Sequence, residues 1–520
     1  MTDPAAAFGG GALGGGAPPA SSAGPPRRGL AAPAALAALA AGGALVTVAL
    51  VYELHHRTST TAAGLLVVGV VAAALLVGRR RLLALRAQTL FDAATLLLPL
   101  FAIMGPALAL PGYRQVFGFR LVLALVVFLG ATVFITSRRL PRLGPRNLVL
   151  LFAGWSAWLG IALLWAPSKS SGLRYLALII SGLVLMACVA ATGDSRRRLR
   201  ILVGTLALGY GLAVAVGALE ALTGHHLHSS AAAGSGHLHA ATGFFYNAND
   251  LATFIAIAWP FLLMALVFGR RARTKVLALV LIGLGLFALL HTGSRSSFIA
   301  IGLTTVAAAV YVIAQRWIRH TGIALVAMVI VLLAFAAVAL NSSQSGLLTQ
   351  LQLHSLTQTT TADQTGAATS SGTRLALTKA GFEAVARYDF LGVGPGNAEA
   401  EGSKQPDAPA GITSLHDWWL EVFVNGGLPA LLAFVLIYVG LLRTSFRVAA
   451  RAGDRFVRLV AAATGISLIG YAVGSLGPST VVSFTPMWIL FGLALAVARR
   501  AHADELAARP PQAVPTGAAR

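Results

Sequence analysis

Charged residues and cysteines are scarce in this chain. Only 11% of its 520 residues are charged, against about a quarter in a typical soluble domain, which excludes an ordinary water-soluble protein. The single cysteine, Cys188, lies inside an apolar run, so disulfides, redox thiol pairs and cysteine metal sites are excluded. Glycine (56) and proline (22) are frequent but follow no fixed period, which excludes a collagen-like or elastic repeat.

Apolar residues dominate what remains. They make up 57% of the chain, and the mean hydropathy is +0.78. Apolar runs of about 20 residues recur, whereas an outer-membrane barrel would show short strands of alternating polarity. The sequence therefore predicts an all-α polytopic membrane protein.

About fourteen runs are long enough to cross a bilayer, and about twelve remain if the alanine-rich first pair is not counted. They lie near 30–52, 61–78, 89–110, 119–137, 148–166, 172–192, 199–222, 247–268, 275–292, 296–315, 321–340, 418–442, 458–477 and 483–498.

The net charge of +22 comes from short basic clusters between the runs. Each cluster follows an even-numbered run, as expected for loops that face the cytoplasm, so both termini are predicted to be cytoplasmic. No basic face of a folded domain is visible, and we expect no nucleic-acid partner. The clusters lie at 79–81, 138–146, 196–200, 270–275, 316–319, 443–458 and 499–500.

This pattern divides the chain into seven parts. The first is rich in Gly, Ala and Pro and has no cleavage site after a short apolar core, so we expect a disordered tail and a retained span, not a signal peptide. The parts are a cytoplasmic tail (1–29), an N-terminal transmembrane bundle (30–222), a histidine-rich extracytoplasmic loop (223–246), core membrane helices (247–340), a long extracytoplasmic loop (341–417), C-terminal transmembrane helices (418–500) and a cytoplasmic tail (501–520).

The histidine-rich loop contains His225, His226, His228, His237 and His239. Neither carboxylate nor cysteine accompanies them, and the surroundings are Ala, Gly and Ser. We therefore favour a flexible loop over a metal site, and expect no metal or other cofactor.

The long loop turns into a more regular segment at 373–388. Leu375, Phe382 and Val385 have helical spacing there, while Lys379, Glu383 and Arg387 recur every fourth residue on another face. This pattern predicts a short amphipathic helix that lies on the membrane.

Arginines on the side facing away from the cytoplasm need a specific reason. Arg174 opens the sixth run, Arg295 lies in the tight turn HTGSRSS, and Arg374 and Arg387 bracket the amphipathic helix. The planar fork of arginine suits phosphate, so these residues are candidate diphosphate ligands, with Arg387 assigned to the wider substrate site. Snorkelling or loop pairing is the alternative for each, and applies least to Arg295.

His416 opens the segment HDWWLEVFVNGGLPALL, where the long loop re-enters the membrane. Histidine is readily poised between proton acceptor and donor near neutral pH, and Asp417 or Glu421 could orient it or replace it. The alternative is an ordinary interfacial histidine beside two tryptophan anchors.

Asn247, Asn249 and Asp250 form another polar cluster, at the outer end of the eighth run. They are candidate substrate-binding residues, and helix capping is the alternative. The glycines of LGVGPGN at 391–397 follow no nucleotide-binding strand, so this segment is predicted to be a turn. The topology sends all these clusters to one face, which predicts one site at the outer membrane surface.

Four motifs resemble the O-antigen ligase and O-antigen polymerase superfamily of bacterial membrane glycosyltransferases, over roughly 245–435. They are FYNANDLA at 245–252, TGSRSS at 292–297, SGTR…GVGPGN within 372–397 and HDWWLEVFVNGGLPALL at 416–432.

This resemblance implies a GT-C-like helical fold of the cytoplasmic membrane and transfer of a glycan from undecaprenyl diphosphate to an acceptor hydroxyl outside the cytoplasm. It implies that Arg295 binds the diphosphate and that His416 serves the acceptor, without nucleotide sugar or metal. The acceptor, whether glycan, lipid or wall polymer, stays open, and so does the choice between ligase and polymerase.

Three positions depart from the family pattern and bear on the subfamily. His416-Asp417 stands where His-Asn is common, Asn425 stands where glutamate is frequent, and residues 388–390 replace a frequent proline. A transporter using Asp92 and Glu220 as intramembrane charges is the competing hypothesis, and a scaffold protein is a third. Against transport, the polar motifs gather at one surface and no repeat relates the two halves.

Overall fold

The computed structural model describes most of the chain from residue 80 onwards. The described residues are 80–110, 113–137, 143–234, 238–314, 370–404, 415, 417–477 and 482–507. The expected spans at 30–52, 61–78 and 321–340 lie outside them.

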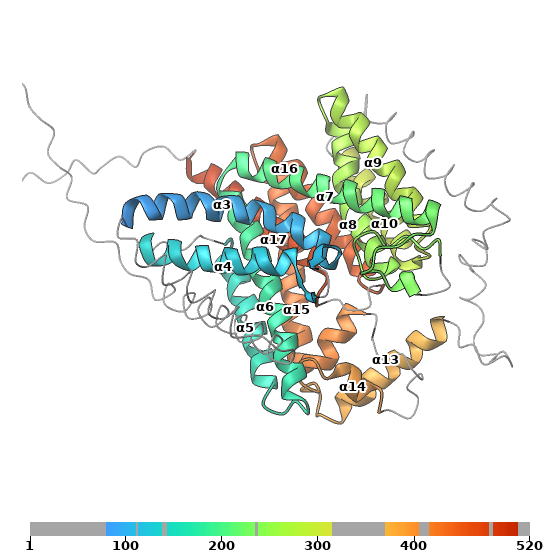
Figure 1. Ribbon diagram of the computed structural model, residues 1–520. Helices are drawn as coiled ribbons and strands as arrows, with labels where there is room; N and C mark the ends of the chain where they lie inside the picture. Colours follow the sequence, from blue (N-terminus) through green and yellow to red (C-terminus); the bar gives the residue numbers. More distant parts are fainter. Residues whose placement is uncertain are drawn as a thin grey trace, which may run out of the picture.

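Within these ranges, nine helices are long and apolar enough to cross a membrane. Helix α5 (Arg146–Ala162) is apolar but shorter, and α17 (Thr485–Ala507) is a further long helix. The chain is therefore an all-α polytopic membrane protein (Figure 1). The nine are α3 (Arg80–Met104), α4 (Gly118–Ser137), α6 (Lys169–Ala191), α7 (Arg196–Thr223), α8 (Ala248–Phe268), α9 (Ala272–Leu290), α10 (Arg295–Ala314), α15 (Trp418–Arg451) and α16 (Arg455–Gly474).

Shorter elements connect these helices. Three 3₁₀ turns are η1 (Gly105–Leu108), η2 (Thr192–Asp194) and η3 (Ala231–Gly234). Strands β1 (Ala109–Leu110) and β2 (Tyr113–Phe117) pair antiparallel between α3 and α4, which pack against each other. Helices α13 (Ser370–Ala386) and α14 (Ala398–Gly402) belong to the long loop and lie at the lower right of Figure 1.

Helix α10 shows the polarity of a membrane helix. Its buried face carries hydroxyl groups, including those of Thr304 and Thr305, whereas Ile299, Val306 and Val310 are exposed. Polar groups inside and apolar groups outside are expected where lipid is the solvent and where small and polar side chains hold helices together.

Helix α17 lies at the centre of the bundle. Trp488 and Phe491 are fully buried, and α17 packs closely on α6. A Cβ atom on Gly182 would lie 2.2 Å from the Trp488 ring, so glycine is required for this approach. Small residues thus let the two backbones pack at short range.

The basic clusters meet at one end of the bundle. Arg196 Nε lies 2.7 Å from Asp454 Oδ2, between the start of α7 and the start of α16. Arg499 donates to the Ala191 carbonyl at 3.1 Å, and Arg455 donates to the Phe268 carbonyl at 3.3 Å. Segments that the charge pattern assigns to one side therefore lie together; that this side faces the cytoplasm stays a prediction.

The amphipathic segment is a helix, α13, as expected. Val385 is fully buried, whereas Leu375 and Phe382 are 72% and 53% exposed. Phe382 meets Phe423 of α15, with the ring centroids 5.1 Å apart. The helix is confirmed, and its position on the membrane stays a prediction.

Candidate active site

The end of α16 contacts three other helices at the end of the bundle opposite the basic clusters. Thr253 of α8 donates its hydroxyl to the Gly474 carbonyl at 3.1 Å. The Trp418 amide of α15 donates to the Ser475 carbonyl at 3.2 Å. Next to them, a Cβ on Gly477 would lie 2.9 Å from Ser296 Oγ of α10. The starts of α8, α10 and α15 are thereby joined around one point.

This corner contains several acidic groups. The hydroxyl of Tyr471, on α16, lies within electrostatic range of the carboxyl groups of Asp250, Asp417 and Glu421. Glu421 also interacts with Tyr175 of α6. Two of the predicted site residues, Asp250 and Asp417, therefore both lie near Tyr471 although 167 positions separate them in the sequence.

Asn247 and Asp417 both cap the amino end of a helix. The Asn247 side chain accepts from the Asp250 amide at 3.1 Å, and Asp417 Oδ1 accepts from the amides of Trp419 and Leu420 at 2.9 and 3.3 Å. These bonds satisfy amides that have no partner within the helix. They also fix both side chains in place, and Asn249 lies half-buried in the same first turn of α8.

The turn before α10 is held by its own side chains. Thr292 donates its hydroxyl to the Leu289 carbonyl at 2.7 Å, and the hydroxyl oxygens of Ser294 and Ser297 are 3.1 Å apart. Arg295 is therefore presented, half-buried, as the first residue of α10. The amino end of a helix and a guanidinium group both attract anions.

The other predicted arginines are spread around the long loop. Arg174 is exposed in the second turn of α6, and Arg387 is exposed directly after α13. Arg374 belongs to the first turns of α13, and its side chain lies outside the described part. His416 also lies outside the described residues, although Leu415 and Asp417 on either side are described.

The segment 391–397 is a turn, and it binds the kink of α15. Gly392, Gly394 and Gly396 have φ angles of 87°, 90° and 70°, which favour glycine. The Val393 amide donates to the Val424 carbonyl at 2.9 Å. We name residues 391–397 the glycine turn.

Glycine is needed on both sides of this contact. Gly427 interrupts α15 with φ 70° and ψ −169°, and the Leu428 amide donates to the Phe390 carbonyl at 2.9 Å. A Cβ on Gly427 would lie 2.3 Å from Phe390 O, and one on Gly392 would lie 2.3 Å from Gly427 N. Phe390 and Asp389 themselves have φ of 58° and 49°, which is uncommon for residues with a Cβ.

The segment that joins α5 to α6 holds the glycine turn from its other side. Trp165 donates its indole N–H to the Gly392 carbonyl at 2.8 Å. Asn397 accepts from the Ser168 amide at 2.8 Å, and Asn425 accepts from the Ala398 amide at 3.3 Å. Asn425, at a position where the family often has glutamate, is thus a buried link between α15 and α14.

A basic group follows directly after α14. Lys404 donates a hydrogen bond to Glu401, and this bond, together with the carboxylate charge, raises the pKa of the Lys404 ammonium above its usual range. The ammonium of Lys404, within the long loop, therefore keeps its positive charge to a higher pH than an ordinary lysine does.

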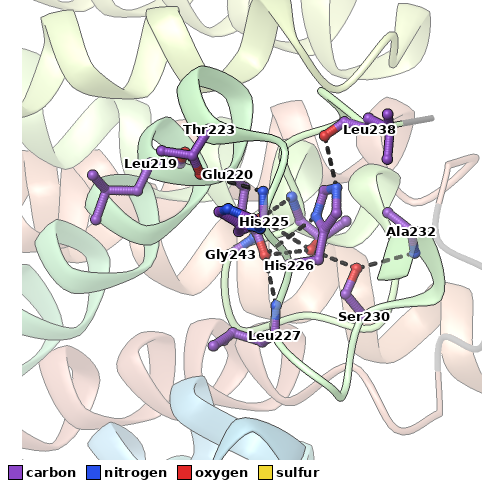
Figure 2. A network of polar contacts seen from close by, with 11 residues as sticks. Leu219, Glu220, Thr223, His225, His226, Leu227, Ser230, Ala232, Leu238 and Gly243 are labelled. Carbon is purple, nitrogen blue, oxygen red and sulfur yellow. Dashed lines mark hydrogen bonds and ion pairs between the residues drawn. The ribbon is translucent and has the colours of Figure 1, made fainter. Parts of the chain in front are cut away.

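The histidine-rich loop is held by a buried carboxylate. Glu220 is 2% exposed and accepts hydrogen bonds from the amides of Thr242 and Gly243, both at 2.7 Å (Figure 2). His226 Nδ1 lies 3.6 Å from Glu220 Oε1, while His226 Nε2 is hydrogen-bonded to the Leu238 carbonyl at 2.9 Å. The expectation of a flexible loop is wrong for these residues, because Glu220 cross-links both ends of the loop.

The two charges assigned to the transporter hypothesis both have structural partners. Glu220 binds the loop, and Asp92 forms an ion pair with Arg198 near the basic end of the bundle. Among the described residues, no group of three or more His, Cys, Asp and Glu side chains could hold a metal ion.

Tyr471 and the Glu220 network are the main features that sequence reasoning missed. Tyr471 lies within an apolar run and has no motif around it. In the sequence, Glu220 stands out only as a charge within a membrane span. Its position next to a loop rich in hydrogen-bond donors is the signal that could have revealed the network.

Two comparisons with known proteins identify the region around this site. A family model described as O-antigen ligase matches residues 280–435. The teichuronic acid biosynthesis protein TuaE of Bacillus subtilis (strain 168) is 26% identical over 400 residues, which cover 74% of this chain and 79% of that protein. The resemblance to the O-antigen ligase and polymerase superfamily is confirmed.

The O-antigen ligase region contains most of the predicted site. Arg295, the glycine turn and the segment 416–432 lie within it, whereas FYNANDLA at 245–252 precedes it. Tyr471 lies beyond its end, and Trp165 and Ser168, which bind the glycine turn, lie before its start.

Proposed function

We propose that this protein is a membrane glycosyltransferase of cell-surface polysaccharide synthesis. It moves a glycan from an undecaprenyl diphosphate carrier onto an acceptor hydroxyl at the outer face of the bacterial cytoplasmic membrane. The observation that carries the proposal is the O-antigen ligase match over 280–435, which contains both Arg295 and His416. The similarity to a teichuronic acid biosynthesis protein supports an envelope polysaccharide as the product class.

The diphosphate is assigned to Arg295 and the amino end of α10. Negative charge grows on the leaving diphosphate as the bond from the anomeric carbon to oxygen breaks, and fixed donors in a poorly hydrated site stabilise it. Arg295 is the first residue of α10, so its guanidinium lies at a helix amino end, which also attracts anions. Arg374, in the first turns of α13, and Arg174, in the second turn of α6, are the further candidates for this role.

The acceptor is assigned to the start of α15. His416 takes the proton of the attacking hydroxyl while the acceptor oxygen bonds to the anomeric carbon and the carrier diphosphate departs. Direct displacement inverts the configuration at that carbon, and neither metal nor other cofactor takes part. The capping bonds of Asp417 fix the residue next to His416, while Asn247, Asn249, Asp250 and Arg387 are assigned to the glycan.

Purified protein in detergent with a lipid diphosphate-linked oligosaccharide tests this function. Carrier release and glycan length are followed for wild type, His416→Ala and Arg295→Lys. We expect both variants to lose transfer by about 100-fold or more, because one lacks the base and the other has a point charge where a planar fork is needed. Lengthening products indicate a polymerase, and unchanged glycans on a new acceptor indicate a ligase.

Two control variants separate the site from general damage. His502→Ala and Arg447→Lys change exposed residues on α17 and at the far end of α15, and should retain transfer. Near-normal transfer by His416→Ala would refute its role as the base. Wild-type protein that releases no carrier with any acceptor would favour a transporter of lipid-linked glycan.

A further inference from the structure

The hydroxyl of Tyr471 is buried without a hydrogen-bond partner among the described residues. Tyr471 is 1% exposed, and its oxygen accepts and donates no bond there. The neighbouring Tyr438, also buried, donates its hydroxyl to the Leu468 carbonyl. Buried polar groups almost always have partners, so the Tyr471 hydroxyl indicates a group that binds there.

A second hydroxyl in the same corner, that of Ser296, is also buried without a hydrogen-bond partner among the described residues. Ser296 is 7% exposed, and its Oγ has no hydrogen-bond partner among the described residues. It faces Gly477, directly beyond α16, while Ala300, one turn further along α10, faces Gly474. Gly474 follows Tyr471 by three positions and so lies on the same side of α16. The two hydroxyls therefore belong to one region.

The ring of Tyr471 is held firmly. It stacks on Phe484 with a centroid distance of 6.4 Å and an interplanar angle of 6°, and it meets Phe491 edge-on at 6.4 Å. The hydroxyl position is thus preset by packing, as expected for a group that binds a ligand with little loss of conformational entropy.

The charges around Tyr471 indicate the chemistry of the ligand. Asp250, Asp417 and Glu421 all lie within electrostatic range of its hydroxyl. Carboxylates accept hydrogen bonds, and tyrosine and serine hydroxyls both donate and accept. A compact metal ion would need converging carboxylates, and the described residues contain no such group of three. A sugar, which presents several hydroxyls over a few ångströms, fits donors and acceptors that are spread out.

We propose that Tyr471 and Ser296 bind hydroxyl groups of the acceptor sugar. This inference rests on the proposed function, and it adds an acceptor subsite on α16, beyond the O-antigen ligase match. The sugar lies between α16 and the starts of α8, α10 and α15, with its hydroxyls on Tyr471, Ser296 and the three carboxylates. The attacking hydroxyl is then positioned next to Asp417 at the start of α15.

The test compares Tyr471→Phe and Ser296→Ala with the matched variant Tyr438→Phe. The acceptor probe is the free oligosaccharide released from the lipid-linked donor by mild acid, and KM and kcat are measured against it. Tyr471→Phe should raise the acceptor KM about tenfold and leave the donor KM unchanged, whereas Tyr438→Phe should stay within about twofold of wild type. Tyr471→Phe should keep or raise the apparent melting temperature, because it removes a hydroxyl that lacks a partner.

Monodeoxy forms of the oligosaccharide identify the contact itself. One deoxy form should have the same KM with wild type as the parent sugar has with Tyr471→Phe. The KM of that deoxy form should also be the same for wild type and for Tyr471→Phe. An acceptor KM of Tyr471→Phe equal to that of Tyr438→Phe, with wild type active, overturns the inference and leaves the glycosyltransferase function standing.

Direct binding covers the remaining case. If wild type releases no carrier, the proposed function fails, and titration calorimetry with the same oligosaccharide still decides the subsite. Binding to wild type and Tyr438→Phe, weakened about tenfold in Tyr471→Phe, supports the subsite. Equal binding to all three proteins, or none to wild type, refutes it.

Discussion

Replacing Gly427 by alanine should separate the glycine turn from α15. The new Cβ would lie 2.3 Å from both Phe390 O and Leu391 C, far inside van der Waals contact. With φ 70° and ψ −169°, Gly427 occupies a region that is essentially restricted to glycine, at a cost of about 1–3 kcal/mol for alanine. The bonds from Val393 N to Val424 O and from Leu428 N to Phe390 O add about 1 kcal/mol each. The expected loss of stability is about 3–5 kcal/mol.

Gly160→Ala is the matched control on α5. Gly160 lies inside that helix, and a Cβ added there would have nothing within 4 Å, so alanine should be neutral or stabilise by up to about 1 kcal/mol. The assay is thermal unfolding of both variants in the same detergent, read from tryptophan fluorescence, together with glycan transfer.

Gly427→Ala should lower the unfolding midpoint by about 5 °C or more and reduce transfer, while Gly160→Ala should do neither. Equal midpoints for the two variants would show that the contact between the turn and α15 does not hold the fold, and would refute this reasoning.

Two further predictions concern the carboxylates of Glu220 and Asp92. Glu220→Gln can keep an oxygen on the amides of Thr242 and Gly243, but it removes the carboxylate charge and puts an NH2 group where Oε1 accepts from the Leu227 amide, at a cost of about 1–3 kcal/mol. Limited proteolysis should cut 224–246 faster than in wild type, and cleavage as slow as in the exposed control Glu505→Gln would contradict the role of Glu220. Asp92→Asn removes one partner of the ion pair with Arg198. It should lower the free energy of unfolding by less than about 1 kcal/mol and leave glycan transfer within about twofold of wild type. Loss of transfer at a normal protein level would mean that Asp92 acts in the reaction.

The helices could be predicted because their signal is local. Runs of about 20 apolar residues mark spans wherever they occur, so α8, α9 and α16 match the expected ranges closely. Helix α17 continues past its apolar run because Arg499 and Arg500 donate to the carbonyls of Ala191 and Asp194. A hydropathy pattern cannot show such partners from another helix.

The site shows the same division between local and distant contacts. The sequence correctly predicted the glycine turn and a helix within 373–388, while the site roles of Arg295 and His416 stay predictions. The sequence did not show that the glycine turn binds the kink of α15 and the segment between α5 and α6. Some of those contacts join residues more than 200 positions apart. Tyr471 could not be predicted at all, because only its missing partner in three dimensions distinguishes it from other buried tyrosines.

The glycine turn binds the segment between α5 and α6, and this contact limits which parts of the sequence can change independently in evolution. The region that resembles O-antigen ligases begins at residue 280, yet Trp165 and Ser168 hold the turn at 391–397 from the N-terminal half. Exchange of residues 280–435 alone by recombination would bring in a glycine turn from another protein. That turn would have to pack against Trp165 and Ser168, which evolved with a different sequence. The two stretches are therefore expected to be inherited together, and a chimaera built to change the acceptor must carry both.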